Sequence, residues 1–338
     1  MKYYFDKRWI GSHGIGRFAS ELHHNLGLES LKVRGTPTSP LDPLRLLFAM
    51  LLRVNGNVGV LSPGYNAPLF CVRRYIFTIC DLNHIDCLEN SSFIKRLYYR
   101  FVIYRAIHKA TRILTISEFS RNRILEWSGV RPENVVNVGV GVDENYHPHI
   151  KPFTPGFSYL LCVSNRKAHK NEVRVVEAFS KAKISGDIRL LFTGDPDRSS
   201  IELCKRNGVE HRVVFMGKVA EEDLPSLYRG ALALIFPSLY EGFGLPVIEA
   251  MACGTPVLTS NTTSLPEVAG DAAFLVSPLS VDEIANGINQ LCSNLDLREL
   301  LIQKGFLQAS RYKWDDVVSR VRAVINGVEG NDDFVTTN

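Results

Sequence analysis

The sequence predicts an α/β fold that consists of two doubly wound domains with parallel sheets. In the second half of the chain, short apolar runs alternate with helical patterns, which is typical of a doubly wound sheet. The length of 338 residues, 45% of them hydrophobic and 22% charged, suits two globular domains that each have a core. Residues 147–156 hold three prolines and a glycine, which predicts a linker between a first domain at 1–146 and a second at 157–311.

The first domain is expected to alternate strands with helices. Residues 8–17 resemble a strand that enters a glycine-containing loop, a helix follows from Phe18, and residues 44–54 have the spacing of an amphipathic helix. Short bounded apolar runs predict further strands at 58–62, 76–79, 111–117 and 135–138. Another helix is expected to begin at Ser117, whose hydroxyl suits an N-cap.

The second domain shows the alternation more regularly. Its apolar runs predict strands at 159–164, 189–193, 213–216, 231–236, 256–259 and 273–276. The segments between them have helical patterns at 171–184, 197–207, 221–230, 246–253 and 264–269, and helical patterns continue from 280 to 326. Each strand is thus followed by a crossover helix, which predicts parallel neighbours.

Composition narrows the classes of function. A net charge of +4 permits anionic ligands or an acidic membrane surface, but it is far from the charge of a dedicated nucleic-acid binder. The seven cysteines include no Cys-x2-Cys pair, so we expect reduced thiols and no zinc site. The first eight residues lack the apolar run of a signal peptide, and residues 46–52 are far shorter than the roughly 20 residues of a spanning helix. We therefore expect a cytoplasmic protein.

The stretch from 231 to 260 predicts a strand, a glycine-rich loop, a short helix and another strand. Gly242 and Gly244 allow main-chain N–H groups to approach a ligand, and Pro246 suits the first turn of a helix whose opening favours a phosphate. Glu241 and Glu249, separated by seven residues, would flank that anion site and accept hydrogen bonds from hydroxyl groups. A ligand with a sugar, a diphosphate and a ribose in line would satisfy all of these groups. The alternative is a pair of solvated glutamates beside a core helix.

Residues 241–249 resemble the E-x7-E motif of retaining glycosyltransferases of family 4, within the frame Phe-Pro-Ser…Glu-Gly-Phe-Gly-Leu-Pro…Glu-Ala-Met-Ala-Cys-Gly-Thr-Pro-Val. The resemblance implies the GT-B fold, in which two Rossmann-like domains face each other across a cleft and a final helix, here at about 312–330, packs back on the first. It also implies that Glu241 and the amides of Phe243 and Gly244 orient the donor sugar, and that Gly242 belongs to the same donor-binding loop. By the same resemblance, the helix opening at Leu245 and Pro246 binds the diphosphate, and Glu249 holds the ribose.

Two further segments resemble donor-binding parts of the same family. Residues 163–171 resemble its diphosphate loop, and we assign the cation that stabilises the leaving diphosphate to Lys170. The partner arginine of the family falls here on Ser164 or Asn165, and Arg166, displaced by at least one position, is the second candidate cation for the leaving diphosphate. The turn with Gly217 and Val219 is expected to bind the base through its backbone.

The first domain carries candidate groups on the acceptor side. The loop from His13 to Arg17 resembles the Gly-Ile-Gly-Arg stretch of the family, in which Gly14 and Gly16 would approach the donor phosphate and the acceptor. At residue 80 a cysteine replaces a histidine that relatives often carry. Asp81 and His84 are therefore the candidates for polar contact with the transferred sugar, although His84 is equally well explained as a loop histidine bonded to the backbone.

Residues 95–112 predict an amphipathic, cationic and aromatic-rich helix, with Leu97, Phe101, Tyr104 and Ile107 at helical spacing. One explanation is an ordinary packed helix with a solvated basic face. The other is a peripheral contact with anionic lipid headgroups, which suits relatives that use lipid-linked acceptors.

Together these features predict transfer of a hexose to a saccharide or lipid-linked saccharide in cell-surface polysaccharide synthesis. Residues 261–268 and the Gly-Ile-Gly-Arg opening resemble bacterial mannosyltransferases of polysaccharide assembly, and this resemblance implies mannose from GDP-mannose as the first choice of donor. UDP-glucose, UDP-N-acetylglucosamine and dTDP-rhamnose are alternative donors, and a noncatalytic nucleotide-sugar-binding protein is an alternative function. A GT-B epimerase would lack the E-x7-E frame, and a phosphorylase would need a lysine-bound pyridoxal phosphate. No aspartate-rich motif is present, so we expect neither a metal nor another cofactor. Retention by same-face displacement is expected because no carboxylate presents itself as a covalent nucleophile.

Overall fold

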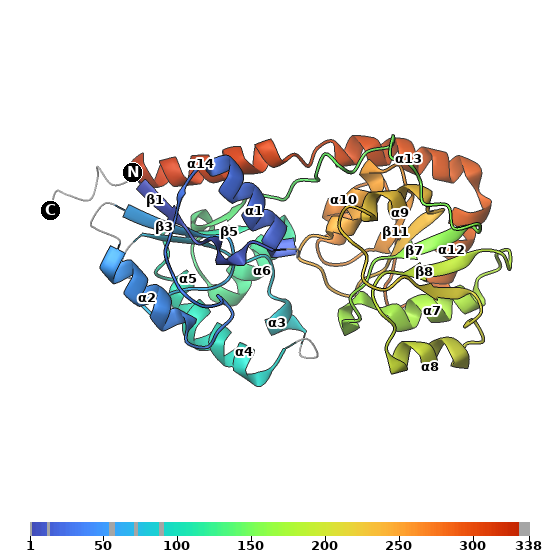
Figure 1. Cartoon of the computed structure of the whole chain (residues 1–338), viewed down its shortest axis with the longest axis horizontal. Helices are drawn as coiled ribbons and strands as arrows, with labels where there is room; N and C mark the ends of the chain where they lie inside the picture. The colour runs from blue at the N-terminus through green and yellow to red at the C-terminus, as the bar shows by residue number, and fades with distance from the viewer. Residues whose placement is uncertain (1, 12–13, 54–57, 71–73, 88–90, 331–338) are drawn as a thin grey trace. The chain divides into compact units, whose positions relative to one another are not determined.

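The computed structural model describes residues 2–11, 14–53, 58–70, 74–87 and 91–330 (Figure 1). The chain divides into two compact units. Unit 1 comprises residues 1–141 and 314–338, and unit 2 comprises residues 142–313. The segment expected as a linker at 147–156 therefore belongs to unit 2. It is packed there, because Phe153 N–H donates to the carbonyl of Ser226 (2.9 Å) and Arg229 Nε donates to the carbonyl of Pro148 (2.9 Å).

Unit 1 contains a six-stranded sheet whose paired strands are all parallel. Its strands are β1 (Lys2–Phe5), β2 (Glu29–Ser30), β3 (Val58–Ser62), β4 (Tyr75–Thr78), β5 (Arg112–Thr115) and β6 (Val135–Asn137), in the order β2-β1-β3-β4-β5-β6. Tyr4 lies opposite Val60 in the pairing of β1 with β3. The strand order reverses between β1 and β3, so this is the switch point of the unit 1 sheet.

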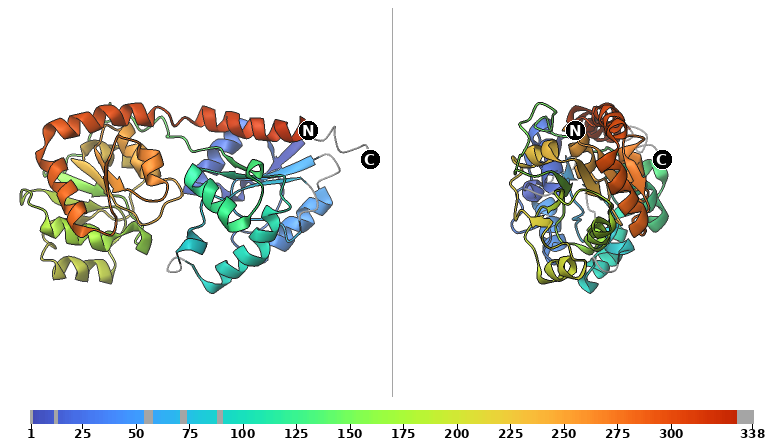
Figure 2. Two further views of the ribbon diagram at one scale, coloured as in Figure 1. Left: turned by 180° about the vertical axis from the view of Figure 1, so that it is seen from behind. Right: turned by 90° about the vertical axis from the view of Figure 1, so that its right-hand side faces the viewer.

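Helices cover both faces of this sheet. Alternate residues of β4 point to opposite faces, so that Tyr75 and Phe77 enter one hydrophobic core and Ile76 the other. The first core also takes side chains from α2 (Asp42–Arg53), the π turn η3 (Tyr99–Ile103), α5 (Tyr104–Ile107) and α6 (Glu118–Ser128). The second core takes them from α1 (Gly14–Leu26) and α14 (Trp314–Gly330), which lie side by side (Figures 1 and 2). The final helix thus completes the core of unit 1.

A buried polar network fixes the switch point of unit 1. The Arg8 guanidinium donates to both oxygens of Asp6 (2.8 and 2.7 Å) and to Asp42, the first residue of α2. Asn66 donates to the same two carboxylates (3.0 and 3.1 Å), and its oxygen accepts from Trp9 Nε1 (2.6 Å). Both carboxylates and Asn66 are fully buried. This network ties the end of β1 to the start of α2.

Unit 2 also has six parallel strands, in the order β12-β11-β10-β7-β8-β9. The strands are β7 (Tyr159–Cys162), β8 (Arg189–Phe192), β9 (Val213–Phe215), β10 (Ala233–Phe236), β11 (Val257–Ser260) and β12 (Phe274–Val276). The helices are α7 (Glu172–Lys181), α8 (Arg198–Arg206), α9 (Leu224–Gly230), α10 (Leu245–Ala252), α11 (Leu265–Ala269), α12 (Val281–Ser293) and α13 (Leu295–Ala309). These elements confirm the predicted doubly wound fold. The strand order reverses between β7 and β10, where ligands of such sheets bind at the carboxyl ends of the strands.

The segment predicted as one helix at 95–112 is α4 (Phe93–Tyr98), the π turn η3 and α5, and β5 already begins at Arg112. Of the four apolar residues at helical spacing, only Ile107 is buried, whereas Leu97, Phe101 and Tyr104 are exposed. The core side chains here are Tyr99, Ile103, Ala106 and Ile107. A π turn adds a residue to the helical period, which explains why regular α spacing selected the wrong face. Within the described ranges, no helix has the length and apolar character needed to cross a bilayer.

Candidate functional site

The loops after β7 and β10 meet at the switch point of unit 2, where they bring two predicted site residues together. Lys170, the last residue of the 3-10 turn η5 (Ala168–Lys170), places Nζ 2.7 Å from Glu241 Oε1. The two side chains are only 14% and 13% exposed. The same ammonium lies 4.6 Å from the centre of the Phe236 ring, at the end of β10. A largely desolvated cation and carboxylate therefore lie where a doubly wound sheet binds its ligand.

Two carbonyl groups of the glycine-rich loop accept hydrogen bonds that hold the loop in place. Ser264 Oγ donates to the carbonyls of Glu241 and Phe243 (both 2.9 Å). Because C=O and N–H of a trans peptide point in opposite directions, these bonds turn the N–H groups of Gly242 and Gly244 away from Ser264. Gly244 has φ +105°, and a Cβ there would lie 2.6 Å from Leu265 Cδ2. This position therefore requires glycine.

Main-chain donors are available where α10 begins. Among the residues that the structure describes, the N–H groups of Phe243, Gly244 and Leu245 have no hydrogen-bond acceptor. Pro246 occupies the first turn of the helix, where its missing N–H leaves no donor unsatisfied. Unpaired amides and the positive end of a helix together form a site for an anion.

Glu249 lies inside α10 and is only 2% exposed. The hydroxyl of Tyr228 donates to its Oε2 (2.8 Å). Burial, followed by the negative charge of Glu249, raises the pKa of Tyr228 well above its ordinary value, so the phenol stays protonated and keeps donating at neutral pH. Sequence reasoning missed this tyrosine because its partner lies on another element.

The guanidinium of Arg166 forms hydrogen bonds with other residues of unit 2. It donates to Glu172 (2.7 Å) and to the carbonyls of Thr193 (2.9 Å), Gly194 (3.0 Å) and Asp195 (3.0 Å). It also stacks on the rings of Phe192 and Phe215, at 5.2 and 4.9 Å. The guanidinium therefore ties the loop after β7 to the loop after β8.

The turn after β9, which is predicted to bind the base, is linked to the loop after β8 by a hydrogen bond. Gly194 N–H donates to the carbonyl of Gly217 (2.7 Å), which links the loop after β8 to the turn after β9. Gly217 has φ +70°, and Val219 is half-buried two residues further on. These two predicted residues thus lie on the same sheet edge as Lys170, two strands away from β7.

Asn171 is a central residue of the site that sequence reasoning did not single out. Its amide donates to the carbonyls of Pro237 (2.9 Å) and Pro278 (2.7 Å), which are 66 and 107 residues away in sequence. Its backbone is left-handed, with φ +61°, a conformation in which asparagine is enriched. The residue thereby fixes Lys170 next to the glycine-rich loop. An asparagine at a helix start was the only signal in the sequence.

Two predicted residues of unit 1 have structural partners. A Cβ on Gly16 would lie 2.2 Å from the carbonyl oxygen of Gly11, so glycine lets α1 pack against the preceding loop. Asp81 Oδ1 accepts the N–H of Asn83 (2.9 Å) at the start of α3 (Asn83–Asp86).

The remaining predicted residues of unit 1 are Gly14, Arg17, His84 and His13. Gly14 and Arg17 lie in the first turn of α1, and His13 lies outside the described residues. The His84 ring lies 6.3 Å from Tyr65 and 6.0 Å from Tyr99, within an aromatic cluster. The acceptor-side roles of these residues stay predictions.

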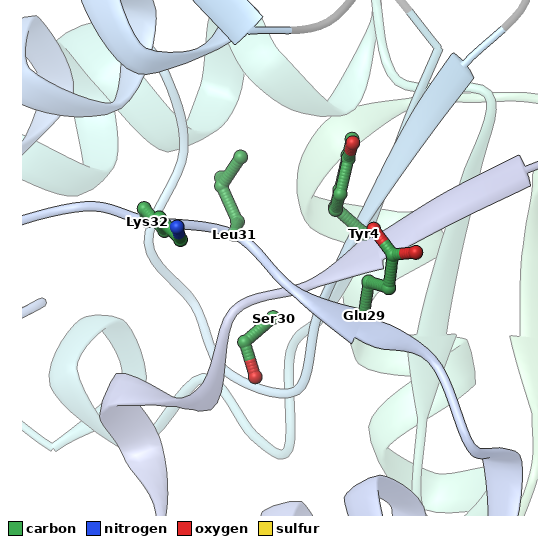
Figure 3. A pocket seen from close by; sticks show the side chains of 5 residues that line it. All are labelled: Tyr4, Glu29, Ser30, Leu31 and Lys32. Carbon is green, nitrogen blue, oxygen red and sulfur yellow. The ribbon is translucent and has the colours of Figure 1, made fainter.

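A hollow of about 480 Å³ lies at the edge of the unit 1 sheet, and Figure 3 shows the residues that line it. It is lined by Tyr4, Glu29, Ser30, Leu31 and Lys32. None of these residues was predicted to bind a ligand. Across the described ranges, no group of three or more histidine, cysteine, aspartate or glutamate side chains could hold a metal ion.

Replacing Tyr228 with phenylalanine is expected to lower the free energy of unfolding by about 1.5–3 kcal/mol, because a buried carboxylate loses a hydrogen-bond donor. Tyr159→Phe is a matched control, since that hydroxyl donates to the neutral carbonyl of Leu227 (2.7 Å). Its loss should cost only about 0.5–1.5 kcal/mol. Urea denaturation of both variants measures the difference. Equal losses would contradict a charged Glu249 as the acceptor.

Unit 2 matches a known protein family, and the chain has curated relatives. Residues 147–308, which lie within unit 2, match the family described as glycosyl transferases group 1. The O-antigen chain mannosyltransferase B of Escherichia coli is 29% identical over 274 residues, which are 76% of this chain and 72% of that protein. The O-antigen chain mannosyltransferase RfbU of Salmonella typhimurium is 27% identical over 238 residues, or 69% of this chain and 64% of that protein.

A solved structure extends the likeness to the whole fold. HepE from Anabaena, determined in complex with UDP and glucose, aligns over 97% of this chain and all of that chain, with a TM-score of 0.77 and 16% identity. The expected resemblance and fold class are confirmed by these findings. The chain is therefore a glycosyltransferase with the GT-B fold, and its unit 2 carries the glycosyl transferases group 1 domain.

Proposed function

We propose that this enzyme transfers mannose from GDP-mannose to a saccharide or lipid-linked saccharide during cell-surface polysaccharide synthesis, with retention of the anomeric configuration. The observation that carries this proposal is the Lys170–Glu241 pair next to the unpaired amides of residues 243–245. The two O-antigen mannosyltransferases among its relatives support mannose as the sugar. HepE, whose structure contains UDP and glucose, supports UDP-glucose as the second candidate donor.

The proposed reaction needs a site that stabilises negative charge on the leaving group. The bond between C1 of the sugar and the phosphate oxygen breaks, and its electron pair passes to the diphosphate. The acceptor hydroxyl oxygen bonds to C1 on the same face, and its proton passes to the departing diphosphate. Lys170 and the amides at the start of α10 would stabilise the charge that develops on the diphosphate. No metal or other cofactor takes part in this scheme.

The two glutamates would bind the remaining parts of the donor. In the structure, Glu241 neutralises Lys170 (2.7 Å). When a diphosphate replaces it as the partner of Lys170, the carboxylate becomes available to accept hydrogen bonds from sugar hydroxyls. Glu249, oriented by Tyr228, would accept from the ribose, and the backbone at Gly217 and Val219 would contact the base.

Arg166 is better suited to positioning than to contact with the diphosphate. Four hydrogen bonds to Glu172 and three carbonyls already occupy its guanidinium. We propose that Arg166 keeps the loops after β7 and β8 in place, so that Lys170 is the principal side-chain cation of the donor site.

Unit 1 is proposed to bind the acceptor through residues 13–17, of which Gly14 to Arg17 form the first turn of α1 and not the expected loop, and through Asp81 and His84. We further propose that the enzyme works on the cytoplasmic side of a membrane, which α4, η3 and α5 contact peripherally. The exposed side chains of Leu97, Phe101 and Tyr104 on this basic segment support that contact. No nucleic acid is expected as a partner.

A donor panel tests the proposed function. The purified enzyme is incubated with radiolabelled GDP-mannose, UDP-glucose, UDP-N-acetylglucosamine or dTDP-rhamnose and a lipid-linked saccharide acceptor, and the linkage formed is read by NMR. We expect an α-linked mannose product. Transfer from another donor alone would overturn the assignment of mannose, and nucleotide binding without any transfer would favour a noncatalytic binding protein.

A further inference from the structure

Unit 1 contains a hollow of about 630 Å³ on the side of the sheet covered by α4 and α6. It is lined by Ile85, Arg96, Arg100, Phe101, Tyr104, Arg105 and Trp127. We call it the arginine pocket. It combines three guanidinium groups with three aromatic rings, and no residue of the donor site lines it.

The arginine pocket is strongly cationic. The segment Phe93–Ile107 that supplies five of its residues contains no acidic side chain. Among the residues that the structure describes, Arg96, Arg100 and Arg105 have no ion-pair partner and no side-chain hydrogen bond. Three guanidinium groups without counter-ions favour an anionic ligand, and their planar donors suit the oxygens of a phosphate.

Two acidic residues within the described ranges are sequence neighbours of lining residues. Asp86 follows Ile85 and Glu126 precedes Trp127, so both lie beside lining residues. Both carboxylates pair instead with Arg123, which donates to Asp86 at 2.7 Å and also to Glu126. Arg123 thereby keeps these carboxylates away from the three pocket arginines.

Apolar surface surrounds the arginine pocket. Phe101 and Tyr104 are exposed within it, and Phe93, Ile94 and Leu97 are exposed on the adjoining α4. The π turn η3 contributes to this arrangement, because Tyr99 and Ile103 enter the core while Arg100 and Phe101 remain at the surface. A free anion would leave these aromatic and aliphatic side chains in water. A ligand with both a phosphate and acyl chains would cover them.

We infer that the arginine pocket binds the phosphate headgroup of an anionic glycerophospholipid. Arg96, Arg100 and Arg105 contact the phosphate, and Phe101 and Tyr104 pack on the start of the acyl chains. This inference rests on the proposed peripheral contact with a membrane, and it names the lipid chemistry that the contact recognises. It does not depend on the identity of the donor sugar.

Binding of monomeric, short-chain phosphatidylglycerol tests the pocket without a bilayer. Calorimetry of the whole enzyme is expected to show saturable one-to-one binding, which Arg100→Gln weakens more than about tenfold. Lys95→Gln is the matched control, because Lys95 is an exposed cation of the adjoining α4 that does not line the pocket. Inorganic phosphate is expected to bind far more weakly. If inorganic phosphate binds as tightly as the lipid, the pocket is a plain anion site and the inference is overturned.

Flotation with vesicles separates this inference from the proposed function. Vesicles of phosphatidylcholine with phosphatidylglycerol should retain the enzyme, and Arg100→Gln should release it at lower salt than Lys95→Gln does. If the two substitutions have equal effects, the membrane contact stands, but the inference that the arginine pocket binds the headgroup is overturned. Absence of flotation by the unaltered enzyme would overturn both. Donor transfer to a water-soluble acceptor is measured alongside, and unchanged transfer by Arg100→Gln shows that the variant is folded.

Discussion

Replacing Lys170 with alanine is expected to lower kcat/KM for sugar transfer by about 10²–10³-fold. The ammonium is the side-chain cation proposed to meet the diphosphate, and removing one such preorganised group from an active site typically costs this much. The loss should lie mainly in kcat, because the charge on the diphosphate develops as the bond breaks. Steady-state kinetics with the donor found in the panel provide the measurement.

Lys167→Ala is the matched control for this experiment. Lys167 lies in the same loop but is exposed and has no ion pair among the described residues. Its removal should leave kcat/KM nearly unchanged. Transfer by Lys170→Ala within a few-fold of the unaltered enzyme would contradict the proposed role. Because Lys170 and Glu241 are in contact, a double-mutant cycle with Glu241→Gln is expected to be strongly non-additive.

Replacing Arg8 with alanine is expected to lower the free energy of unfolding of unit 1 by about 3–5 kcal/mol, because two fully buried carboxylates then lose their counter-charge. Asp6 and Asp42 would keep only the donors of Asn66 and the backbone. Arg8→Lys keeps the charge but not the planar fork, so its loss should be intermediate. Chemical denaturation, followed by the fluorescence of the three tryptophans, all of which lie in unit 1, measures the effect.

Lys2→Ala is the control for burial. Its ion pair with Glu29 has the same length, 2.7 Å, as the contact between Arg8 and Asp6, but both of its side chains are more than half exposed. Its removal should leave stability nearly unchanged. If Arg8→Ala lowers the free energy of unfolding no more than Lys2→Ala does, the buried network does not stabilise unit 1.

The stabilising effect of Arg8 is expected to be constant around neutral pH. Burial opposes its charge, but hydrogen bonds and the charges of Asp6 and Asp42 outweigh burial and raise its pKa above an already very high ordinary value. A raised pKa contributes stability that is fully present below the unfolded-state value and is lost only as the pH rises through the folded-state value. Both values lie far above neutrality. The difference between the unaltered enzyme and Arg8→Ala should therefore not fall between mildly acidic and mildly basic pH.

The fold of unit 2 was predictable because its local patterns and its tertiary structure agree. The run expected at 189–193 is β8 (Arg189–Phe192), and the helix expected at 246–253 is α10 (Leu245–Ala252). Central parallel strands are continuous apolar runs, and Pro246 and Gly254 mark the ends of the helix between them. Where proline and glycine separate such strands and helices, the alternation of these elements along the chain is enough to predict parallel strands joined by crossover helices.

The segment at 93–107 was less predictable. Regular helical spacing selected Leu97, Phe101 and Tyr104 as one face, whereas the structure buries Tyr99 and Ile103. The π turn changes the helical period in the middle of the segment. It also accompanies the packing of Tyr99 and Ile103 in the core, which leaves no signal in the local sequence.

Several contacts of the donor site could not be derived from sequence at all. The amide of Asn171 reaches carbonyls 66 and 107 residues away, and Arg166 reaches carbonyls 27 to 29 residues away. Such pairs depend on strand order, which spacing does not specify. The motif around Glu241 indicated which residues belong to the site, whereas the residues that hold them in place became visible only in three dimensions.

The packing of α14 on α1 has a consequence for biosynthesis. Val317, Val318 and Val321 share a core with Phe18 and Leu22, yet the ribosome adds them after all of unit 2. The half of the protein that is translated first therefore cannot close its hydrophobic interior until the half translated second has emerged. During that interval, the nascent α1 surface is exposed to chaperones and to other unfinished chains.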